Sequence, residues 1–411
     1  MVEKTQKLEF DGHSGARLAA RLDLPNGPVR GYALLVHCFT CSKDLVGLRR
    51  IGSELARAGI AVLRFDFTGL GSSEGEFAST NFSTNIQDIY SAVDFMRSNL
   101  EAPALMIGHS LGGAAVLAAA GKVEEVQAVV TLGAPSDADH VLENFHADIG
   151  EIERSGKARV DLHGRHFTIE RQFLDDVREH KLADAIKDLR KPLLIMHAPG
   201  DEIVGIDSAT AIFTAARHPK SFVSLDKADH LLTDEADARF AASVIAGWAS
   251  RYLAPDHSQA EEPIEHVRVS ETGVGQFQNA VQAGRHRLFA DEPEEMGGDD
   301  TGPSPYDFLS AALGACTSMT LRIYAQHKKI DLGRVSVDVS HRKVHRKDSG
   351  SDISNGKSGR IDQFDRLISV EGELDEALRA KVVEIANKCP VHRTLENSSH
   401  VLTRLVDEDE E

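Results

Sequence analysis

The chain has 411 residues, and because a single hydrophobic core stops growing at about 250–300 residues, two or more domains are expected. Hydrophobic residues make up 41% of it, and together with 33 glycines this share is typical of globular proteins and excludes disorder of the whole chain. The formal net charge of −18 disfavours a nucleic-acid partner, and no apolar run is long enough to span a membrane.

The first half of the chain alternates short apolar runs with helical patterns. Such runs predict strands buried on both faces of a parallel sheet, and their alternation with helices predicts a doubly wound α/β fold. Residues 136–188 interrupt the alternation, contain a helical pattern at 170–179, and are expected to form a small cap over the C-terminal edge of the sheet. The predicted strands are 31–36, 61–67, 104–107, 126–132, 193–197 and 221–225, and the predicted helices are 45–58, 85–99, 111–120 and a last one ending near 253.

A serine lies between a predicted strand and a predicted helix. The sequence ALMIGHSLGG places Ser110 there, with Gly108 and Gly112 two residues to either side. Small flanking residues allow the tight, strained turn that exposes a nucleophilic hydroxyl, and the backbone N–H of Leu111 then lies at a helix N-terminus, where it can stabilise an oxyanion. The pattern favours Ser110 as a nucleophile over the alternative of an ordinary turn serine.

A serine nucleophile needs a base, and the base needs an acid that orients it. Asp201 follows the predicted strand 193–197, and His230 follows the next strand along the chain. The chain order serine, aspartate, histidine is the order that this architecture uses. Asp207 is the alternative acid, but Asp201 follows its strand directly and is preferred.

Residues 8–253 resemble an α/β-hydrolase of the esterase or serine-aminopeptidase kind. Besides the serine, aspartate and histidine, two segments carry the likeness. HCFT at 37–40 takes the place of the family's H-G-x loop, and DFTGLGSS at 66–73 matches its D-x-x-G-x-G-x-S turn.

The resemblance implies that the N–H groups of Phe39 and Leu111 bind the oxyanion. Cys38 stands where the family usually has glycine, so its side chain is expected beside that oxyanion site. The implied reaction is hydrolysis of an ester, a thioester or a small amide of a small-molecule acyl substrate, through an acyl-Ser110 intermediate. Neither a metal nor an organic cofactor is implied.

The pattern of the chain changes after APDHSQAEEP, residues 254–263, an acidic stretch with two prolines that we interpret as a linker. It separates a domain at 1–253 from one at 264–411. The second domain is predicted to be α+β, with a polar loop at 346–360. Its expected elements are a hairpin within 264–290, a long helix at 305–328, strands at 335–344 and 364–374, a helix at 376–388 and a last strand at 399–406.

Two cysteines lie in the second half. Cys316 occurs inside an apolar helical run, where a buried core cysteine is the ordinary interpretation, and Cys389 occurs where Pro390 ends a helix. Residues 264–411, however, resemble the osmotically inducible OsmC and organic hydroperoxide resistance family. The segments that carry the likeness are AGRHRLFADEP, GPSPYD with the LSAALGAC that follows it, and KCPVHR.

That resemblance implies that the Cys316 thiolate attacks an organic hydroperoxide and that Cys389 traps the product as a disulfide. Arg285, or alternatively Arg287, would activate the thiolate, and a dithiol would reduce the disulfide again. The family's intertwined architecture implies a homodimer. Tyr306 stands where hydroperoxide reductases of the family usually have glutamate, ten residues before the helix cysteine.

Cys38 and Cys41 form the sequence C-F-T-C beside the predicted oxyanion loop. A structural or incidental role is the leading interpretation, and a redox role is the alternative. Zinc is disfavoured because no second cysteine pair occurs at zinc-ribbon spacing. The histidines of the predicted cap form no strong ligand pattern and are interpreted as surface residues: His140, His146, His163 and His166.

The sequence therefore predicts a serine hydrolase fused to an OsmC-like thiol domain. The alternatives are a thiol peroxidase whose first half supplies substrate or serves as a scaffold, and a catalytically silent binding scaffold. Residues 1–10 lack the apolar stretch of a signal peptide, and four cysteines are too few for a secreted disulfide framework of this length. A cytoplasmic location is expected.

Overall fold

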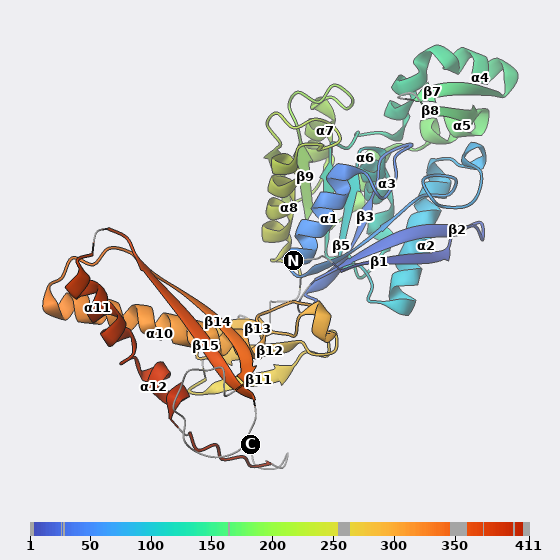
Figure 1. The fold of residues 1–411 in the computed structure, drawn as a ribbon. Helices are drawn as coiled ribbons and strands as arrows, with labels where there is room; N and C mark the ends of the chain where they lie inside the picture. The colour runs from blue at the N-terminus through green and yellow to red at the C-terminus, as the bar shows by residue number, and fades with distance from the viewer. Residues whose placement is uncertain are drawn as a thin grey trace. The chain divides into compact units, whose positions relative to one another are not determined.

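The computed structural model divides the chain into two compact units, residues 1–264 and 265–411, each with hydrophobic clusters of its own (Figure 1). The predicted linker at 254–263 and nearly all of the predicted loop at 346–360 lie outside the described residues. The structure describes residues 4–25, 27, 29–162, 165–253, 264–345, 360–372, 374–397 and 399–405.

The first unit is built on an eight-stranded sheet with the strand order β1-β2-β4-β3-β5-β6-β9-β10. All strands from β4 to β10 in this order pair in parallel, which confirms the predicted doubly wound α/β fold. Strands β4, β5, β6 and β9 are buried along their whole length, because helices cover both faces of the sheet. The strands are β1 (Lys4–Asp11), β2 (Arg17–Leu24), β3 (Gly31–Val36), β4 (Ile60–Phe65), β5 (Leu105–His109), β6 (Ala128–Leu132), β9 (Leu193–His197) and β10 (Lys220–Ser224).

The N-terminal hairpin of β1 and β2 is an addition to the predicted sheet. It pairs antiparallel, and β2 joins β4, also in antiparallel fashion. In β2, buried and partly exposed residues largely alternate, so no continuous apolar run marks the strand in the sequence.

Helices pack on both faces of the sheet. One hydrophobic cluster joins the sheet to α1 and α8, and the other joins it to α2, α3, α6 and α7. Asn81 begins α2 with a capping box, because its side chain accepts from the Thr84 N–H while the Thr84 hydroxyl returns a bond to the Asn81 backbone. The helices are α1 (Val46–Arg57), α2 (Phe82–Asn99), α3 (Leu111–Ala119), α6 (Leu182–Asp188), α7 (Asp207–Ala215) and α8 (Glu235–Ala249), with short 3₁₀ turns η1 (Phe77–Ser79) and η2 (Ala120–Lys122).

The segment between β6 and α6 forms a small layer of its own (Figure 1). Its centre is the antiparallel pair of β7 and β8; residues 163–164, between them in the chain, lie outside the described residues. Leu162 ends β7 and Arg165 begins β8, and both line the cavity that Ser110 also lines. The elements are η3 (Ala138–Asp148), α4 (Ile149–Ser155), β7 (Lys157–Leu162), β8 (Arg165–Glu170) and α5 (Arg171–Glu179).

Within its described residues, the second unit combines two antiparallel sheets with three α-helices, as expected for an α+β domain. Its long helix begins at Pro305, and the preceding Ser304 caps it with Asp307 in a capping box, which is a start signal readable from the sequence. The elements are β11 (Val267–Glu271), β12 (Asn279–Ala283), β13 (His286–Ala290), η4 (Glu294–Met296), α10 (Pro305–Lys328), β14 (Val335–His345), β15 (Arg360–Val370), α11 (Glu376–Ala386) and α12 (Pro390–Glu396).

The predicted strand at 399–406 is wrong. Residues 399–405 are exposed and form no strand, and residue 406 lies outside the described residues. An apolar alternation becomes a strand only where another strand offers hydrogen-bond partners, and the sheets of the described residues contain no such partner for this segment. Among the helices of the described residues, including the 24-residue α10, none is apolar enough over sufficient length to cross a membrane.

Candidate functional site

Ser110 lies in the turn between β5 and α3. Its backbone has φ 54° and ψ −128°, a conformation that L-residues rarely adopt, and its N–H donates to the Leu132 carbonyl at 2.9 Å. A Cβ atom on Gly108 would meet the backbone of Gly112, and one on Gly112 would meet the backbone of His37. Glycine at these two positions therefore allows β5, α3 and the end of β3 to approach closely enough to form the turn.

Two further side chains meet at the Ser110 hydroxyl. His230, in the loop after β10, lies with Nε2 3.0 Å from the Ser110 Oγ and with Nδ1 2.7 Å from the Asp201 Oδ2. Asp201, in the loop after β9, accepts as well from the N–H groups of Ile203 and Val204. The three side chains thus form one hydrogen-bonded chain, whereas the alternative acid of the sequence, Asp207, is exposed in the first turn of α7.

The Asp201 carboxyl is ionised at neutral pH. Burial raises its pKa, but hydrogen bonds from His230 and from the Val204 and Ile203 N–H groups outweigh that effect, so the pKa lies below its usual value. A carboxylate in this place accepts the Nδ1–H of the imidazole and so leaves Nε2 as the acceptor that faces the serine.

His109 supports the loop that carries His230. Its Nε2 lies 2.6 Å from the His230 carbonyl oxygen, and its ring is fully buried. Burial, together with the neighbouring His230, lowers the pKa of His109 to about 3, so the ring is neutral and donates its Nε2–H to that carbonyl. The G-H-S-L-G pattern contains this histidine, but only the tertiary contact shows its role.

Two backbone N–H groups close to Ser110 have no acceptor. Within the described residues, neither the N–H of Phe39 nor that of Leu111 donates a hydrogen bond. Leu111 is the first residue of α3, where the N–H groups of a helix are free of intrahelical partners. Both groups are therefore available to an anionic oxygen, as the resemblance to hydrolases implies.

A cavity of about 810 Å³ contains Ser110 and His230. Three residues of the cap, Asn144, Leu162 and Arg165, form part of its wall. The Arg165 guanidinium donates to the Thr40 carbonyl at 2.9 Å and so connects the cap to the loop after β3. Nothing in the local sequence marks Arg165, because only the folding of the cap hairpin brings it to the cavity. The apolar part of the lining is Phe39, Leu45, Leu162, Ile203, Ala228 and Leu231.

Cys38 and Cys41 are joined by a disulfide. The Cys38 side chain, which replaces the family's glycine, is therefore bonded to the second cysteine of its own loop, and neither sulfur is a free thiol. In the described part of the chain, no three His, Cys, Asp or Glu side chains group as a metal site would require, and His163 lies outside it.

The two cysteines of the second unit are free thiols next to one another. Cys389 is buried at the start of α12, where its Sγ accepts the His392 N–H at 3.3 Å and lies 3.7 Å from the Thr317 Oγ1. Burial raises the pKa of the Cys389 thiol, but hydrogen bonds from His392, Thr317 and Cys316, with the Arg366 charge, bring it below its usual value. Cys316, on α10, is partly exposed.

The arginine in this network is Arg366 of β15. It donates to the Thr317 Oγ1 at 2.7 Å and to the Asn387 Oδ1 at 2.8 Å. It also lines a cavity of about 520 Å³ together with His392. Arg285 lies exposed in the turn between β12 and β13, and its assignment as the activating arginine stays a prediction. No motif marks Arg366, because the pairing of β14 with β15 places it beside α10.

Tyr306 stands where hydroperoxide reductases usually have glutamate, and its contact is that of an aromatic ring. The Tyr306 ring stacks on His341 with 4.0 Å between the ring centres. The neighbouring carboxylate, Asp307, accepts from the Ser304 hydroxyl and backbone N–H and so caps α10. The Asp307 carboxylate is thus part of the capping box that begins α10.

Two protein-family models match the chain. A model described as "Serine aminopeptidase, S33" matches residues 28–149, and one described as "OsmC-like protein" matches residues 297–404. A solved esterase domain of a Rhodothermus marinus protein is 47% identical, covers 61% of this chain and 99% of its own, and has a TM-score of 0.50.

A curated relative from mouse, the mitochondrial palmitoyl-protein thioesterase ABHD10, is 30% identical over 189 residues. The match covers 44% of this chain and spans 62% of the length of that relative. A solved structure of the mouse protein is 21% identical with a TM-score of 0.51, covers 60% of this chain and 99% of that one, and shows a shared fold.

Replacing Asp201 should separate the two candidate acids. We expect Asp201→Asn to lower kcat for ester hydrolysis by about 10⁴-fold, because an amide no longer fixes the imidazole tautomer that accepts the serine proton. Asp207→Asn, an equal change on an exposed residue, should leave kcat within about twofold. Steady-state kinetics with a chromogenic ester measure both, and an equal loss in the two variants would contradict the assignment of Asp201.

Proposed function

Because the chain joins an α/β-hydrolase of the esterase and serine-aminopeptidase kind to an OsmC-like domain, we propose that its first unit is a serine hydrolase that cleaves esters or thioesters. The observation that carries this proposal is that Ser110, in a tight turn, His230 and Asp201 form one hydrogen-bonded chain beside the cavity. A buried, ionised carboxylate behind a histidine that contacts a serine hydroxyl is the arrangement that activates the hydroxyl as a nucleophile.

The proposed reaction has two steps. His230 Nε2 takes the proton of Ser110 as the Oγ attacks the acyl carbonyl, and the N–H groups of Phe39 and Leu111 bind the oxygen that becomes negative. His230 then gives the proton to the leaving oxygen or sulfur, which departs and leaves an acyl-Ser110. A water molecule, deprotonated by the same imidazole, releases the acid and restores the serine.

The cavity favours an apolar acyl group. Phe39, Leu162 and Ile203 contribute apolar side chains to it, and its volume of about 810 Å³ suits a ligand of small-molecule size. Both ester and thioester substrates agree with the relatives, since one is named an esterase domain and another a palmitoyl-protein thioesterase.

A fluorophosphonate probe tests the nucleophile, because such a probe bonds covalently to an activated serine. We expect one label per chain in the wild type, with mass spectrometry placing it on Ser110, and no label in Ser110→Ala. Ser98→Ala, which alters an exposed serine of α2, should label as the wild type does. If Ser110→Ala is labelled as strongly as the wild type, the serine-hydrolase proposal is wrong.

We further propose that the second unit reduces organic hydroperoxides with its thiol pair. Two neighbouring free thiols support this, and one of them, Cys389, has a lowered pKa beside Arg366. The more accessible Cys316 thiolate would attack the O–O bond, giving an alcohol and a sulfenic acid. Cys389 would then attack that sulfur, which forms a disulfide and releases water, and an external dithiol would restore both thiols.

Two arginine substitutions test which guanidinium activates the pair. We expect Arg366→Met to shift the pH profile of disulfide formation with cumene hydroperoxide to higher pH, because loss of the positive charge raises the pKa of the Cys389 thiol. Intact-protein mass follows the reaction, and Arg366→Lys, which keeps the charge, should recover part of the rate at neutral pH. A shift confined to Arg285→Met would instead support the assignment from the family resemblance. No peroxide-dependent disulfide in the wild type would exclude the peroxidase activity.

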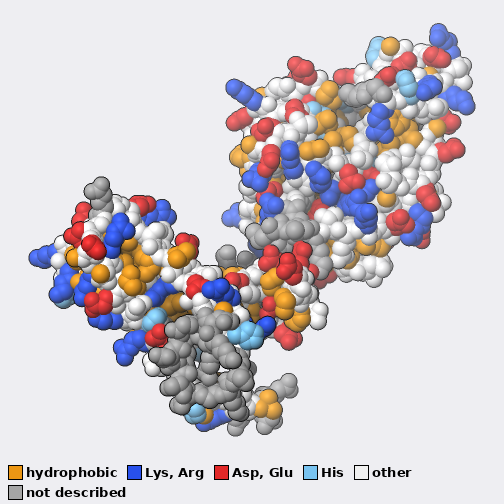
Figure 2. Space-filling view, in the orientation of Figure 1, with side chains coloured by type: hydrophobic (Ala, Val, Ile, Leu, Met, Phe, Trp, Pro, Cys, Tyr) orange, Lys and Arg blue, Asp and Glu red, His pale blue; other side chains and the backbone are white. Residues whose placement is uncertain are grey.

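We also propose that the second unit pairs with a second copy of the chain. Its buried cluster is small, comprising Leu321, Ala325, Leu332, Val382 and Ile385. Large apolar side chains are exposed instead, including Met319 and Ile323 one turn apart on α10, at 64% and 65% exposure. Figure 2 shows apolar side chains in the open on the visible face of this unit. An uncovered apolar face of this kind is the mark of an interface.

Light scattering tests this pairing. We expect the wild type at twice the mass of the 44.7 kDa chain and the variant Met319→Lys with Ile323→Lys at the single mass. Phe240→Lys, at a 49% exposed apolar residue of α8 in the first unit, is the matched control and should keep the double mass. A wild-type chain that stays single at micromolar concentration would contradict the pairing.

A further inference from the structure

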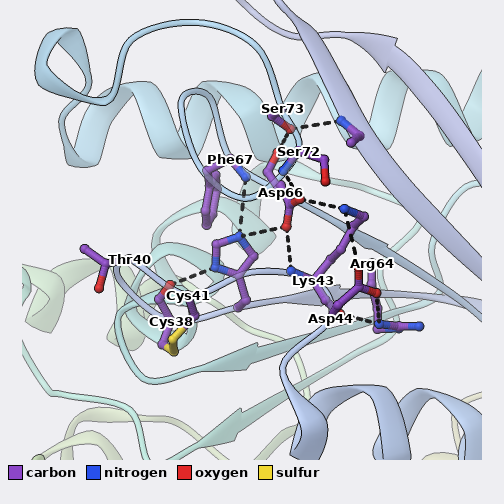
Figure 3. Close-up of polar contacts among 12 residues, drawn as sticks. Cys38, Thr40, Cys41, Lys43, Asp44, Arg64, Asp66, Phe67, Ser72 and Ser73 are labelled. Carbon is purple, nitrogen blue, oxygen red and sulfur yellow. Dashed lines mark hydrogen bonds and ion pairs between the residues drawn. A yellow bond between two sulfur atoms is a disulfide. The ribbon is translucent and has the colours of Figure 1, made fainter. Parts of the chain in front are cut away.

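The loop between β3 and α1 forms one wall of the cavity above Ser110. Cys38, Phe39, Thr40 and Cys41 all line that cavity. The disulfide joins the first and last of them and so closes a small ring around the two residues between (Figure 3). Thr40 has φ 59°, in the left-handed region that non-glycine residues seldom occupy. The disulfide therefore constrains a segment whose backbone is not in a relaxed conformation.

The peptide between Cys38 and Phe39 carries the N–H that is proposed to bind the oxyanion. Its carbonyl oxygen, on Cys38, accepts hydrogen bonds from the His37 Nδ1 at 2.7 Å and from the Cys41 N–H at 3.2 Å. In a planar trans peptide the N–H points opposite to the carbonyl, so fixing the oxygen fixes the direction of the N–H. The disulfide holds Cys41 against Cys38 and thereby keeps one of these two donors in place.

The other donor, His37, is held independently of the disulfide. Its ring is buried and accepts the Phe67 N–H at Nε2 over 3.4 Å. Burial lowers the pKa of His37, so the neutral ring donates its Nδ1–H to the Cys38 carbonyl. The beginning of the loop therefore stays attached to the turn after β4 whatever the state of the two sulfurs.

The end of the loop is held by a buried ion pair. Lys43 donates to the two oxygens of Asp66 through its backbone N–H and its Nζ, both at 2.6 Å (Figure 3). Arg64 donates to the Lys43 carbonyl and is itself paired with Asp23. Because both ends of the loop are fixed, opening the disulfide would release residues 39–41 between them. The peptide that carries the candidate N–H would then lose the restraint on its Cys41 donor and keep only the hydrogen bond from His37.

The middle of the loop has weaker support. The exposed Arg165 donates to the Thr40 carbonyl, and the Phe39 ring packs on Phe77 and Phe173 with ring centres 5.6 Å and 5.3 Å away. Ring contacts hold a side chain, whereas the direction of the Phe39 N–H depends on the backbone angles on either side of its peptide. The disulfide acts on those angles.

We propose that the Cys38–Cys41 disulfide is a positioning element of the hydrolase, which aims the Phe39 N–H at the oxyanion, and that a dithiol lowers turnover by reducing it. This inference rests on the proposed serine-hydrolase function. Loss of one oxyanion donor lowers kcat by about 10²–10³-fold, so a displaced donor should lower it by about ten- to a hundredfold. KM should change little, because the donor acts on the transition state.

The reduction is a complete thiol–disulfide exchange. One thiolate of the dithiol attacks the sulfur of Cys41, which lines the cavity and is less buried than Cys38. The Cys38 sulfur leaves as a thiolate and takes a proton, and the second thiol of the reagent then closes its own disulfide and releases Cys41. Two electrons pass from the reagent to the protein.

The test compares the oxidised and the reduced full-length protein. The wild type is treated with dithiothreitol and freed of reagent under argon, and mass spectrometry counts the opened disulfides. The kcat and KM for p-nitrophenyl acetate are then measured before reduction, after reduction and after reoxidation with oxidised dithiothreitol. The double variant Cys38→Ser with Cys41→Ser undergoes the same cycle and also controls for Cys316 and Cys389, which it retains. Circular dichroism checks that the variant is folded.

We expect reduction to lower the wild-type kcat at least tenfold with KM within about twofold, and reoxidation to restore it. The double variant should have the low kcat before and after dithiol. If the oxidised enzyme hydrolyses the ester and kcat does not change when the disulfide is opened, the positioning role is overturned. If the dithiol also inhibits the double variant, other thiols cause the effect, and the positioning role is overturned as well. If the oxidised wild type neither hydrolyses the ester nor labels at Ser110, the hydrolase proposal fails and this inference falls with it.

Discussion

The turn that joins β5 to α3 depends on how closely three stretches of backbone approach one another. Ser110 has a positive φ because the chain must reverse from a buried strand into a helix within one residue, and Gly108 and Gly112 leave room for the backbones that meet there. The turn places a hydroxyl at the carboxyl edge of the sheet, where the loops after β9 and β10 bring Asp201 and His230. Every chemical step proposed for the first unit needs that approach.

The second constraint on the first unit is electrostatic and lies behind the loop after β3. Asp66 is fully buried and accepts hydrogen bonds from Lys43 and the Ser72 N–H, so its burial is compensated and it ties two loops together. The D-x-x-G-x-G-x-S turn thus supports the loop after β3 through Asp66, and the disulfide joins two cavity-lining residues of the same loop. A covalent bond and a buried ion pair therefore act on one short segment.

The second unit holds two free thiols next to one another. Cys389 sits at the start of α12, where a backbone N–H, a threonine hydroxyl and a guanidinium all favour the thiolate over the thiol. Cys316 reaches the same place from α10, with one thiol buried and the other accessible. Such a difference in access fits the proposed pair, in which Cys316 meets the hydroperoxide and Cys389 then attacks the sulfenic sulfur formed on Cys316.

Local patterns in the sequence predicted much of the first unit and its candidate site. Continuous apolar runs indicated the buried parallel strands, and the glycines around Ser110 indicated the turn between β5 and α3. The positions of Asp201 and His230 followed from the loops that end consecutive strands. The sequence did not reveal β1 and β2, whose apolar residues face one side, and it produced a strand at 399–406 for which no partner exists among the described strands. The position of Arg366 beside the Cys389 thiol and the bond between Cys38 and Cys41 became visible only in the folded chain, because strand pairing and the path of a loop bring these side chains together. Arg366 left no mark in its own segment, because its partners Thr317 and Asn387 come from other parts of the chain.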